Sequence, residues 1–193
     1  VKDFDLERIF AKEGVQIMHL SGLIAALSPE TSDFCLQLAR YAKRHGTLIS
    51  FDLNHRATFW KGREKELKEA FAEIASLSDI LIGNEEDFQL CLGVQGPKAG
   101  GENIEDTIDA FKGMILNARK AFPNVSVFAN TLREVISANE HLWGAIVYEN
   151  ENWHVAPLRK INVVDRIGGG DGFVGGLLYS ILKEMPSEKW IQF

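Results

Sequence analysis

Short apolar runs alternate with long amphipathic segments along this chain, and this alternation constrains the fold more than any other feature. Runs typical of buried strands cover residues 15–20, 47–54, 79–84 and 125–130. Segments with helical spacing separate them, at residues 29–45, 67–77 and 108–122. Strands joined by crossovers of this length pair in parallel through right-handed connections. We therefore predict one α/β domain over residues 1–193, with a mainly parallel sheet and helices on both faces.

Each predicted helix has an apolar face that would pack on the sheet. Ser28 and Pro29 suit the cap and first turn of a helix that ends near Gly46. The expected buried faces are Phe34, Leu38, Tyr41 and His45; Leu67, Phe71, Ile74 and Leu77; and Ile108, Phe111, Ile115, Ala118 and Phe122. Residues 145–157 contain two strand-like runs around a polar turn, which predicts a hairpin. A last helix is expected to start at Ser187.

Composition excludes several classes of function. The 193 residues are 46% hydrophobic and carry a formal net charge of -6, which favours a globular domain with a sizeable core. Because no Lys/Arg cluster occurs, we expect no nucleic-acid or membrane partner and a small-molecule ligand instead. Cys35 and Cys91 lie in apolar surroundings, so we expect buried free thiols and a reducing compartment. No apolar run approaches the roughly 20 residues of a membrane span, and we expect a cytoplasmic protein.

Polar clusters occur where the predicted strands end. They are residues 21–22, 52–56, 84–87, 130–133 and 165–171. In open α/β sheets, ligands bind beyond the carboxyl ends of the strands. We therefore expect these five clusters to converge on one rim and to form the functional site.

The last cluster contains three consecutive glycines, Gly168 to Gly170, followed by Asp171 and a predicted helix. The N–H groups of such a turn bind anions, and a plain cap would not need glycines that cost chain entropy. We interpret the turn as an anion hole for a phosphoryl group and Asp171 as the base for an attacking hydroxyl. Asp171 as a simple helix cap is the alternative, and Asp165 either orients the turn or is a solvated loop residue.

Two other phosphate motifs fit less well. Residues 170–175 match the dinucleotide pattern G-x-G-x-x-G, but the last glycine falls inside the predicted helix. No G-x-x-x-x-G-K-S/T sequence occurs, which excludes a P-loop. An NAD-dependent dehydrogenase is therefore the weakest functional hypothesis.

Residues 163–176, VVDRIGGGDGFVGG, resemble the D-T-x-G-A-G-D signature of the PfkB, or ribokinase-like, carbohydrate kinases, and are most similar to 2-keto-3-deoxygluconate kinases. Four more stretches follow the order of that subfamily: LSGLIAALS, SFDLNHRATFW, ILIGNEEDF and NTLRE. The resemblance implies a ribokinase-like three-layer sandwich and the ATP- and Mg²⁺-dependent phosphorylation of a sugar-acid hydroxyl, foremost that of 2-keto-3-deoxygluconate. It also implies that Asp171 is the catalytic base and that Gly168, Gly169 and Gly170 form the anion hole.

The resemblance assigns a sugar site and part of an ATP site. Its D-x-N-x-R pattern places Asp52, Asn54 and Arg56 at the sugar, and arginine binds carboxylates through two hydrogen bonds. An ion pair between Arg56 and Asp52 is the alternative. Thr131 and Arg133 would contact ATP, although exposed polarity at a strand end would also explain them.

The family's N-x-x-E element, which helps to place Mg²⁺ and phosphate through water, corresponds to residues 84–87. Asn84 matches, but the fourth position is Asp87, so Glu86 is the other candidate for indirect metal binding. Acidic residues are common in any first helical turn, which is the alternative explanation. Asp165 and Asn84 complete the predicted nucleotide contacts.

Other hypotheses stay open beside the sugar-acid kinase. A kinase for fructose, ribose or a nucleoside would share the turn and the base, and a sugar-binding relative could keep the fold without catalysis. The chain begins at Val1 and ends in EKWIQF, without the family's N-terminal lid region and C-terminal end. We therefore expect a core truncated at both ends, with little or no activity alone and with a possible homodimer in the longer protein.

Overall fold

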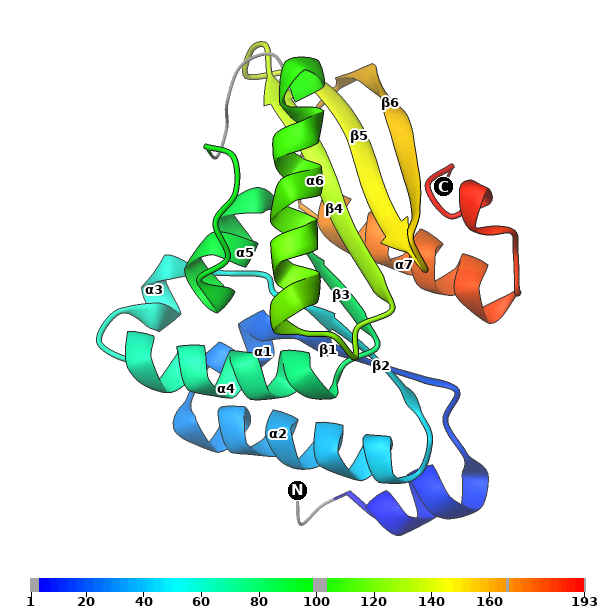
Figure 1. The fold of residues 1–193 in the computed structure, drawn as a ribbon. Coiled ribbons are helices and arrows are strands. Elements are labelled where there is room, and N and C mark those ends of the chain that lie inside the picture. Colours follow the sequence, from blue (N-terminus) through cyan, green and yellow to red (C-terminus); the bar gives the residue numbers. More distant parts are fainter. Residues whose placement is uncertain (1–3, 99–103, 166, 193) are drawn as a thin grey trace.

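The sheet has six strands whose spatial order follows the sequence, β1-β2-β3-β4-β5-β6 (Figure 1). The structure is a computed structural model that describes residues 4–98, 104–165 and 167–192. The strands are β1 Ile17–Ser21, β2 Leu48–Asp52, β3 Ile80–Gly83, β4 Val127–Val135, β5 Glu140–Glu149 and β6 Asn152–Asn162. β1 to β4 pair in parallel, whereas β5 and β6 form an antiparallel hairpin on β4. The predicted α/β class and the hairpin are confirmed.

Helices cover both faces of the sheet. The first face carries α1 Gly22–Ala26, α2 Pro29–Arg44, α3 Ala57–Trp60, α4 Glu64–Leu77, α5 Glu85–Leu92 and α6 Ile104–Ala121. α7 Gly169–Leu182 lies on the opposite face (Figure 1). Right-handed crossovers between sequential neighbours all fall on the same side of a sheet. The helices between strands therefore gather on one face, and the other receives only α7 among the described helices that pack on the sheet.

Two apolar cores result from these layers. The larger one packs Phe51, Leu81 and Phe128 of the sheet against α1 to α6. The smaller one packs Phe173, Val174 and Leu177 of α7 against β3, β4 and β5. The smaller core fixes the position of the N-terminus of α7, which carries the glycine turn.

The start of α2 is as predicted, but its buried face is not. The Ser28 side chain accepts a hydrogen bond from the backbone N–H of Thr31, and the Thr31 side chain accepts one from Ser28 in return. The buried residues are the smaller Ser32, Cys35, Ala39 and Ala42. Phe34, Leu38 and Tyr41 are only half-buried, and His45 is exposed. Small side chains let α2 approach its neighbours α1 and α4 closely, which explains the correction.

Several boundaries also differ from the sequence-based predictions. The helix expected to start at Ser187 is only a short 3₁₀ turn, Ser187–Lys189, and a π-helix over Glu7–Glu13 precedes β1. The loop after β2 contains α3.

Cys35 and Cys91 are buried free thiols, as predicted. Within the described ranges, no helix combines the length and apolar character needed to cross a membrane.

Candidate active site

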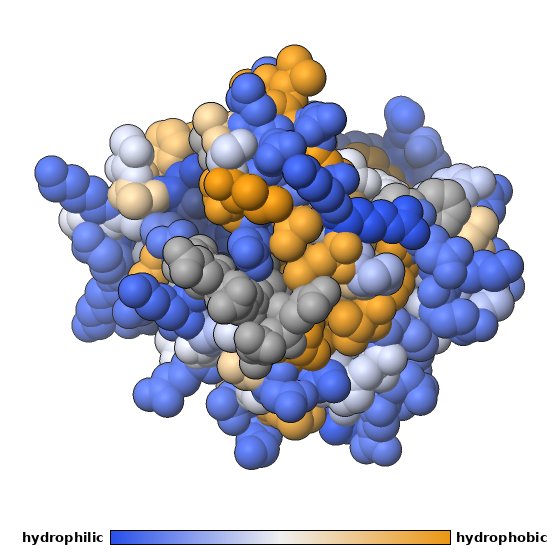
Figure 2. Space-filling model, turned by 90° about the horizontal axis from the view of Figure 1, so that it is seen from above, coloured by the Kyte–Doolittle hydropathy of each residue, from blue (hydrophilic) through white to orange (hydrophobic). Residues whose placement is uncertain are grey.

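Two adjoining cavities open between the carboxyl ends of the parallel strands and the N-terminus of α7. The first cavity has a volume of about 950 Å³ and extends over β4 and β5. The second cavity, of about 730 Å³, lies between α1 and the start of α7. Apolar side chains gather at the centre of this end of the molecule, within a hydrophilic surround (Figure 2). The two cavities share one wall, which consists of Asp52, Asn54, Arg56, Val163, Asp165, Ile167, Gly168 and Gly170.

The glycine turn forms the border between the cavities. Gly168 is the N-cap of α7 and has a φ of 80°, a left-handed conformation that favours glycine. Among the described residues, no side chain caps the helix, so the first N–H groups of α7 are available to an anion. A Cβ on Gly168 or Gly170 would meet no atom within 4 Å, which shows that space is open beside the turn.

The two aspartates around the turn have different roles. Asp165 accepts a hydrogen bond from the backbone N–H of Ile167, at 2.9 Å, so it shapes the approach to the turn. Asp171 is exposed in the first turn of α7 and lines the second cavity. Asp171 therefore lies next to the glycine turn, and its role as the base stays a prediction. Arg166 of this cluster lies outside the described residues.

Asp52, Asn54 and Arg56 gather at the shared wall, although not through strand alternation. β2 ends at Asp52, and Asn54 has a φ of 38°, so the alternation of strand side chains does not continue to Arg56. The Asn54 side chain donates to Ser21 Oγ at 3.1 Å, and the Asn54 backbone N–H donates to Asp52 at 3.2 Å. Arg56 donates to the carbonyl of His55 at 2.7 Å. Among the described residues, Arg56 forms no ion pair within 4.0 Å of Asp52.

The surroundings of the Asp52 carboxyl disfavour its ionised form. Burial and the nearby charge of Asp87 raise its pKa from 3.8 to about 7, and Asp171 adds to this effect. The backbone N–H of Asn54 and the charge of Arg56 oppose the rise only in part. Asp52 therefore carries a proton for part of the time at neutral pH, unlike an ordinary surface aspartate.

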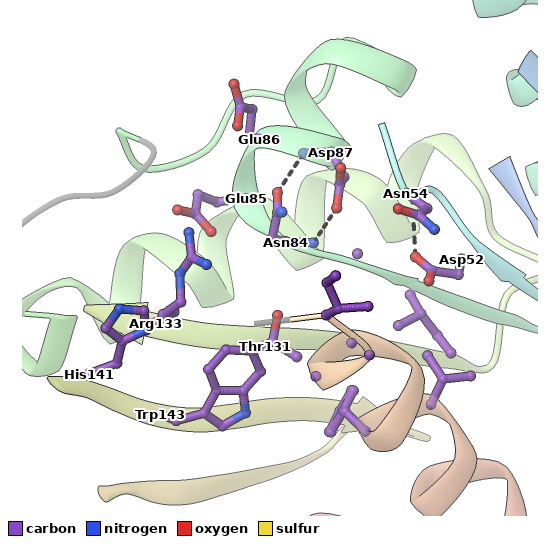
Figure 3. A pocket seen from close by; sticks show the side chains of 18 of the residues that line it. Asp52, Asn54, Asn84, Glu85, Glu86, Asp87, Thr131, Arg133, His141 and Trp143 are labelled. Carbon is purple, nitrogen blue, oxygen red and sulfur yellow. Dashed lines mark hydrogen bonds between the residues drawn. The ribbon is translucent and has the colours of Figure 1, made fainter. Parts of the chain in front are cut away.

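Residues 84–87 form a reciprocal cap at the start of α5. Asn84 Oδ1 accepts from the N–H of Asp87, and Asp87 Oδ2 accepts from the N–H of Asn84, each at 2.8 Å (Figure 3). The other Asp87 oxygen accepts from the backbone N–H of His55 at 2.9 Å. Burial raises the pKa of Asp87 despite these bonds. Both oxygens of Asp87 are thus engaged by the protein.

The geometry near Asp87 offers no direct metal cage. Glu86 is exposed and points away from Asp87 and the other labelled side chains (Figure 3). No group of three or more His, Cys, Asp or Glu side chains within the described ranges could hold a metal ion. The indirect role of Glu86 or Asp87 in binding Mg²⁺ therefore stays a prediction.

Thr131 and Arg133 face the first cavity from within β4, not from its end. β4 continues to Val135, so the predicted strand end at residues 130–133 is wrong. Residues that are two apart share one face of a strand, which places Thr131, Arg133 and Val135 together. Asn130 points to the other face, where it is fully buried. The continuation arises because β5 pairs along the whole of β4.

His141 and Trp143 of β5 line the first cavity, and the sequence analysis missed both. They lie opposite Val135 and Arg133, so they extend the same wall (Figure 3). A Cβ on Gly169 would come within 3.6 Å of the Trp143 ring, which therefore supports the glycine turn. The alternation of side chains along a strand over residues 140–149 could have predicted that His141 and Trp143 share one face.

The candidate residues therefore meet at one rim. All but Asp171 line the first cavity, and Asp171 lines the second.

The chain matches the family model for pfkB family carbohydrate kinases over residues 6–122 and 143–193. This chain belongs to the pfkB carbohydrate kinase family. The residues between the two matched ranges, 123–142, include Thr131 and Arg133.

Individual pfkB relatives agree with this assignment. The structure of 2-dehydro-3-deoxygluconokinase from Thermotoga maritima superposes with a TM-score of 0.86 and 32% identity, covering 98% of this chain and 54% of that one. A sugar kinase of Pyrococcus horikoshii, solved with ATP, gives a TM-score of 0.62 and 25% identity, covering 93% and 49%. A 5-dehydro-2-deoxygluconokinase of Geobacillus kaustophilus is 26% identical over 175 residues, covering 90% and 46%. The chain thus spans about half the length of these relatives.

Proposed function

We propose that the protein to which this chain belongs transfers the terminal phosphoryl group of ATP to a hydroxyl of a sugar acid, foremost 2-keto-3-deoxygluconate. One observation carries the proposal: an uncapped glycine N-terminus borders two cavities, with Asp171 in one and Arg133 in the other. Such an arrangement can hold a phosphoryl group between a nucleotide and an acceptor.

The proposed chemistry assigns a role to each part of the turn. The N–H groups at the start of α7 bind the transferring phosphoryl oxygens, where the helix dipole favours negative charge. Asp171 accepts the proton of the acceptor hydroxyl, whose oxygen forms the new P–O bond. The bond between the phosphoryl group and ADP breaks, and ADP leaves with the electron pair. Catalysis of this kind depends mainly on positioning and charge stabilisation.

The first cavity fits ATP in size and lining. Thr131 and Arg133 supply a hydroxyl and a cation for phosphates, while Trp143, Ile161 and Val163 supply apolar surface for a base. The described residues offer Mg²⁺ no direct cage, so we assign it only water-mediated contacts with Glu86 or Asp87. Ions of this kind usually keep several waters and bind chiefly to the substrate phosphates.

The second cavity fits a sugar acid. Asn54 and Arg56 line it together with Asp52, and arginine is the side chain best suited to a carboxylate. Fructose, ribose and nucleosides have no carboxylate for this arginine to bind. The named activities of the Thermotoga and Geobacillus relatives both concern deoxygluconate derivatives, which supports a sugar acid and leaves two candidate isomers.

The test is ATP-dependent phosphorylation by the full protein that contains these residues. We expect 2-keto-3-deoxygluconate or 5-dehydro-2-deoxygluconate to be preferred over fructose and ribose. Asp171→Asn should lower kcat by several orders of magnitude with little change in KM. The exposed Asp109→Asn serves as a matched control that keeps activity.

Two further results would decide between the hypotheses. Arg56→Lys should raise KM for the sugar acid far more than for ribose, because the two-bond geometry is lost. If no sugar is phosphorylated, or if Asp171→Asn is as active as the parent, the kinase proposal fails. Nicotinamide binding in place of ATP binding would favour the dehydrogenase. We expect the 193-residue chain alone to show little turnover.

A further inference from the structure

The loop that follows β2 carries Asn54 and Arg56 to the cavities, and it leaves the sheet abruptly. The backbone N–H of Leu53 donates to the carbonyl of Ile82 at 2.9 Å, which continues the pairing of β2 with β3 by one residue. Asn54 then has a φ of 38°, a conformation that a non-glycine residue keeps only where its surroundings hold it. The chain therefore needs a second anchor on the far side of Asn54.

Asp87 of α5 provides this second anchor. One of its carboxylate oxygens accepts from the backbone N–H of His55 at 2.9 Å, and the other accepts from the N–H of Asn84 at 2.8 Å. Asp87 is only 7% exposed, and a Cβ on Gly83 would lie 3.0 Å from the Asp87 Cβ, so the side chain packs tightly against β3. A buried carboxylate with an N–H on each oxygen has little freedom to turn. The position of His55 is therefore fixed from α5.

His55 in turn contacts the Arg56 side chain. The carbonyl of His55 accepts from Nη1 of the guanidinium at 2.7 Å, and the His55 ring packs against the buried ring of Trp60, with centroids 5.0 Å apart. Asp87, His55 and Arg56 thus form a chain of two hydrogen bonds. Among the described residues, Nε and Nη2 of Arg56 have no hydrogen-bond partner, and they form an edge that can bind a carboxylate through two parallel bonds. Arg56 lines both cavities.

We propose that Asp87 is a positioning residue for Arg56: through His55 it holds the guanidinium at the border of the two cavities, with Nε and Nη2 left for the carboxylate of the sugar acid. This inference rests on the proposed function, because the sugar acid is the ligand assigned to Arg56. An arginine that is held before the ligand arrives loses less freedom on binding. The aspartate suits this role, because a glutamate at the third position of α5 would carry its carboxylate one methylene farther from the two N–H groups.

The first arm of the test measures the order of the loop in the full protein and needs no turnover. Asp87→Ala removes both acceptors, and we expect faster hydrogen–deuterium exchange over residues 53–60, because the N–H of His55 is no longer held. The matched control is Ser28→Ala, which removes a similar cap from α2 at a residue that lines neither cavity. It should leave exchange over residues 53–60 unchanged. Exchange in Asp87→Ala equal to the parent's would overturn the inference.

The second arm is kinetic and uses Asp87→Asn, which keeps the volume of the side chain but has one acceptor oxygen for two N–H groups. We expect KM for the sugar acid to rise roughly tenfold, in line with the loss of one hydrogen bond to a charged group. KM for ATP and kcat at saturating sugar should stay close to the parent's. If Asp87→Asn instead raises KM for ATP and leaves KM for the sugar acid unchanged, Asp87 serves the nucleotide site and the positioning role is wrong.

A double-mutant cycle tests whether Asp87 acts through the arginine. In an Arg56→Ala background, Asp87→Asn should raise KM for the sugar acid by less than about twofold, because no guanidinium is left to position. A merely structural role would give the same increase in both backgrounds, and that result would overturn the inference.

The outcomes separate the two proposals. If the parent phosphorylates the sugar acid and Asp87→Asn matches it in KM, the positioning role is wrong and the kinase proposal stands. If the parent has no sugar kinase activity, the proposed function fails, and the exchange arm still tests whether Asp87 holds the loop. If Asp87→Ala does not fold, exchange over residues 53–60 in Asp87→Asn decides the question.

Discussion

Replacement of Asp52 by asparagine should make the folded protein more stable at neutral and alkaline pH. Burial and neighbouring carboxylates raise the pKa of Asp52 from 3.8 to about 7. The unfolded chain has lost its proton above pH 4, while the native state still holds it up to about pH 7. The native state therefore binds more protons in this window, and the free energy of unfolding falls as pH rises through it.

The size of this effect follows from the two pKa values. At about 1.4 kcal/mol per pKa unit, a change from 3.8 to about 7 corresponds to an upper limit of about 4 kcal/mol at pH 8. Asparagine is close in shape and keeps an oxygen for the N–H of Asn54, the bond now made by Asp52 at 3.2 Å. It lacks the charge that burial and Asp87 make unfavourable. The gain should thus vanish near pH 4 and grow towards pH 8.

Urea unfolding at several pH values between 4 and 8 measures this difference. The control is Asp79→Asn: Asp79 pairs with Lys43 at 2.8 Å and accepts the N–H of Ile49 at 2.9 Å. That variant should be less stable, because it loses favourable bonds. The reasoning is refuted if Asp52→Asn is also destabilised at pH 8, or if its difference from the parent is the same at every pH.

Three further predictions concern folding and reactivity. Asp87→Ala should lower the free energy of unfolding by about 2 to 4 kcal/mol in urea titrations, because the part-buried N–H groups of Asn84 and His55 lose their acceptor. Stability equal to the parent's would contradict this. Gly22→Ala should unfold or fail to accumulate, because its Cβ would lie 2.1 Å from the Leu53 carbonyl oxygen. The control Gly170→Ala has open space at its Cβ and should keep the parent's thermal stability. Native Cys35, whose pKa burial raises to about 11, and the buried Cys91 should resist alkylation at pH 8 until urea unfolds the chain; fast labelling of the native protein would refute their burial.

The sequence predicted the architecture because apolar periodicity is a local signal. The four parallel strands and the helices between them follow directly from spacing, and the hairpin from its polar turn. The glycine turn with Asp171 was also recognisable. Three adjacent glycines before a helix lose much chain entropy on folding, so their presence indicates a function. The rim followed from one topological rule, that parallel strands present their carboxyl ends together.

The parts that were missed depend on long-range pairing. β4 runs on to Val135 because β5 pairs beside it, so Thr131 and Arg133 lie inside a strand. Trp143 enters the site through that same pairing. The reciprocal cap of Asn84 and Asp87 matches a local pattern, but the bond from His55 to Asp87 crosses 32 residues. No local pattern could show that Asp87 would have both oxygens occupied.

The sequential strand order also bears on how the chain folds during synthesis. Each strand from β2 to β6 pairs with the strand made just before it, so the sheet can grow in step with the emerging polypeptide. Nearest-neighbour pairing keeps the sequence separation of these contacts small, which favours rapid folding. α7 and Asp171 follow all six strands and join residues of β1 and β2 that were made far earlier. A nascent chain can thus acquire most of its core before the candidate site exists.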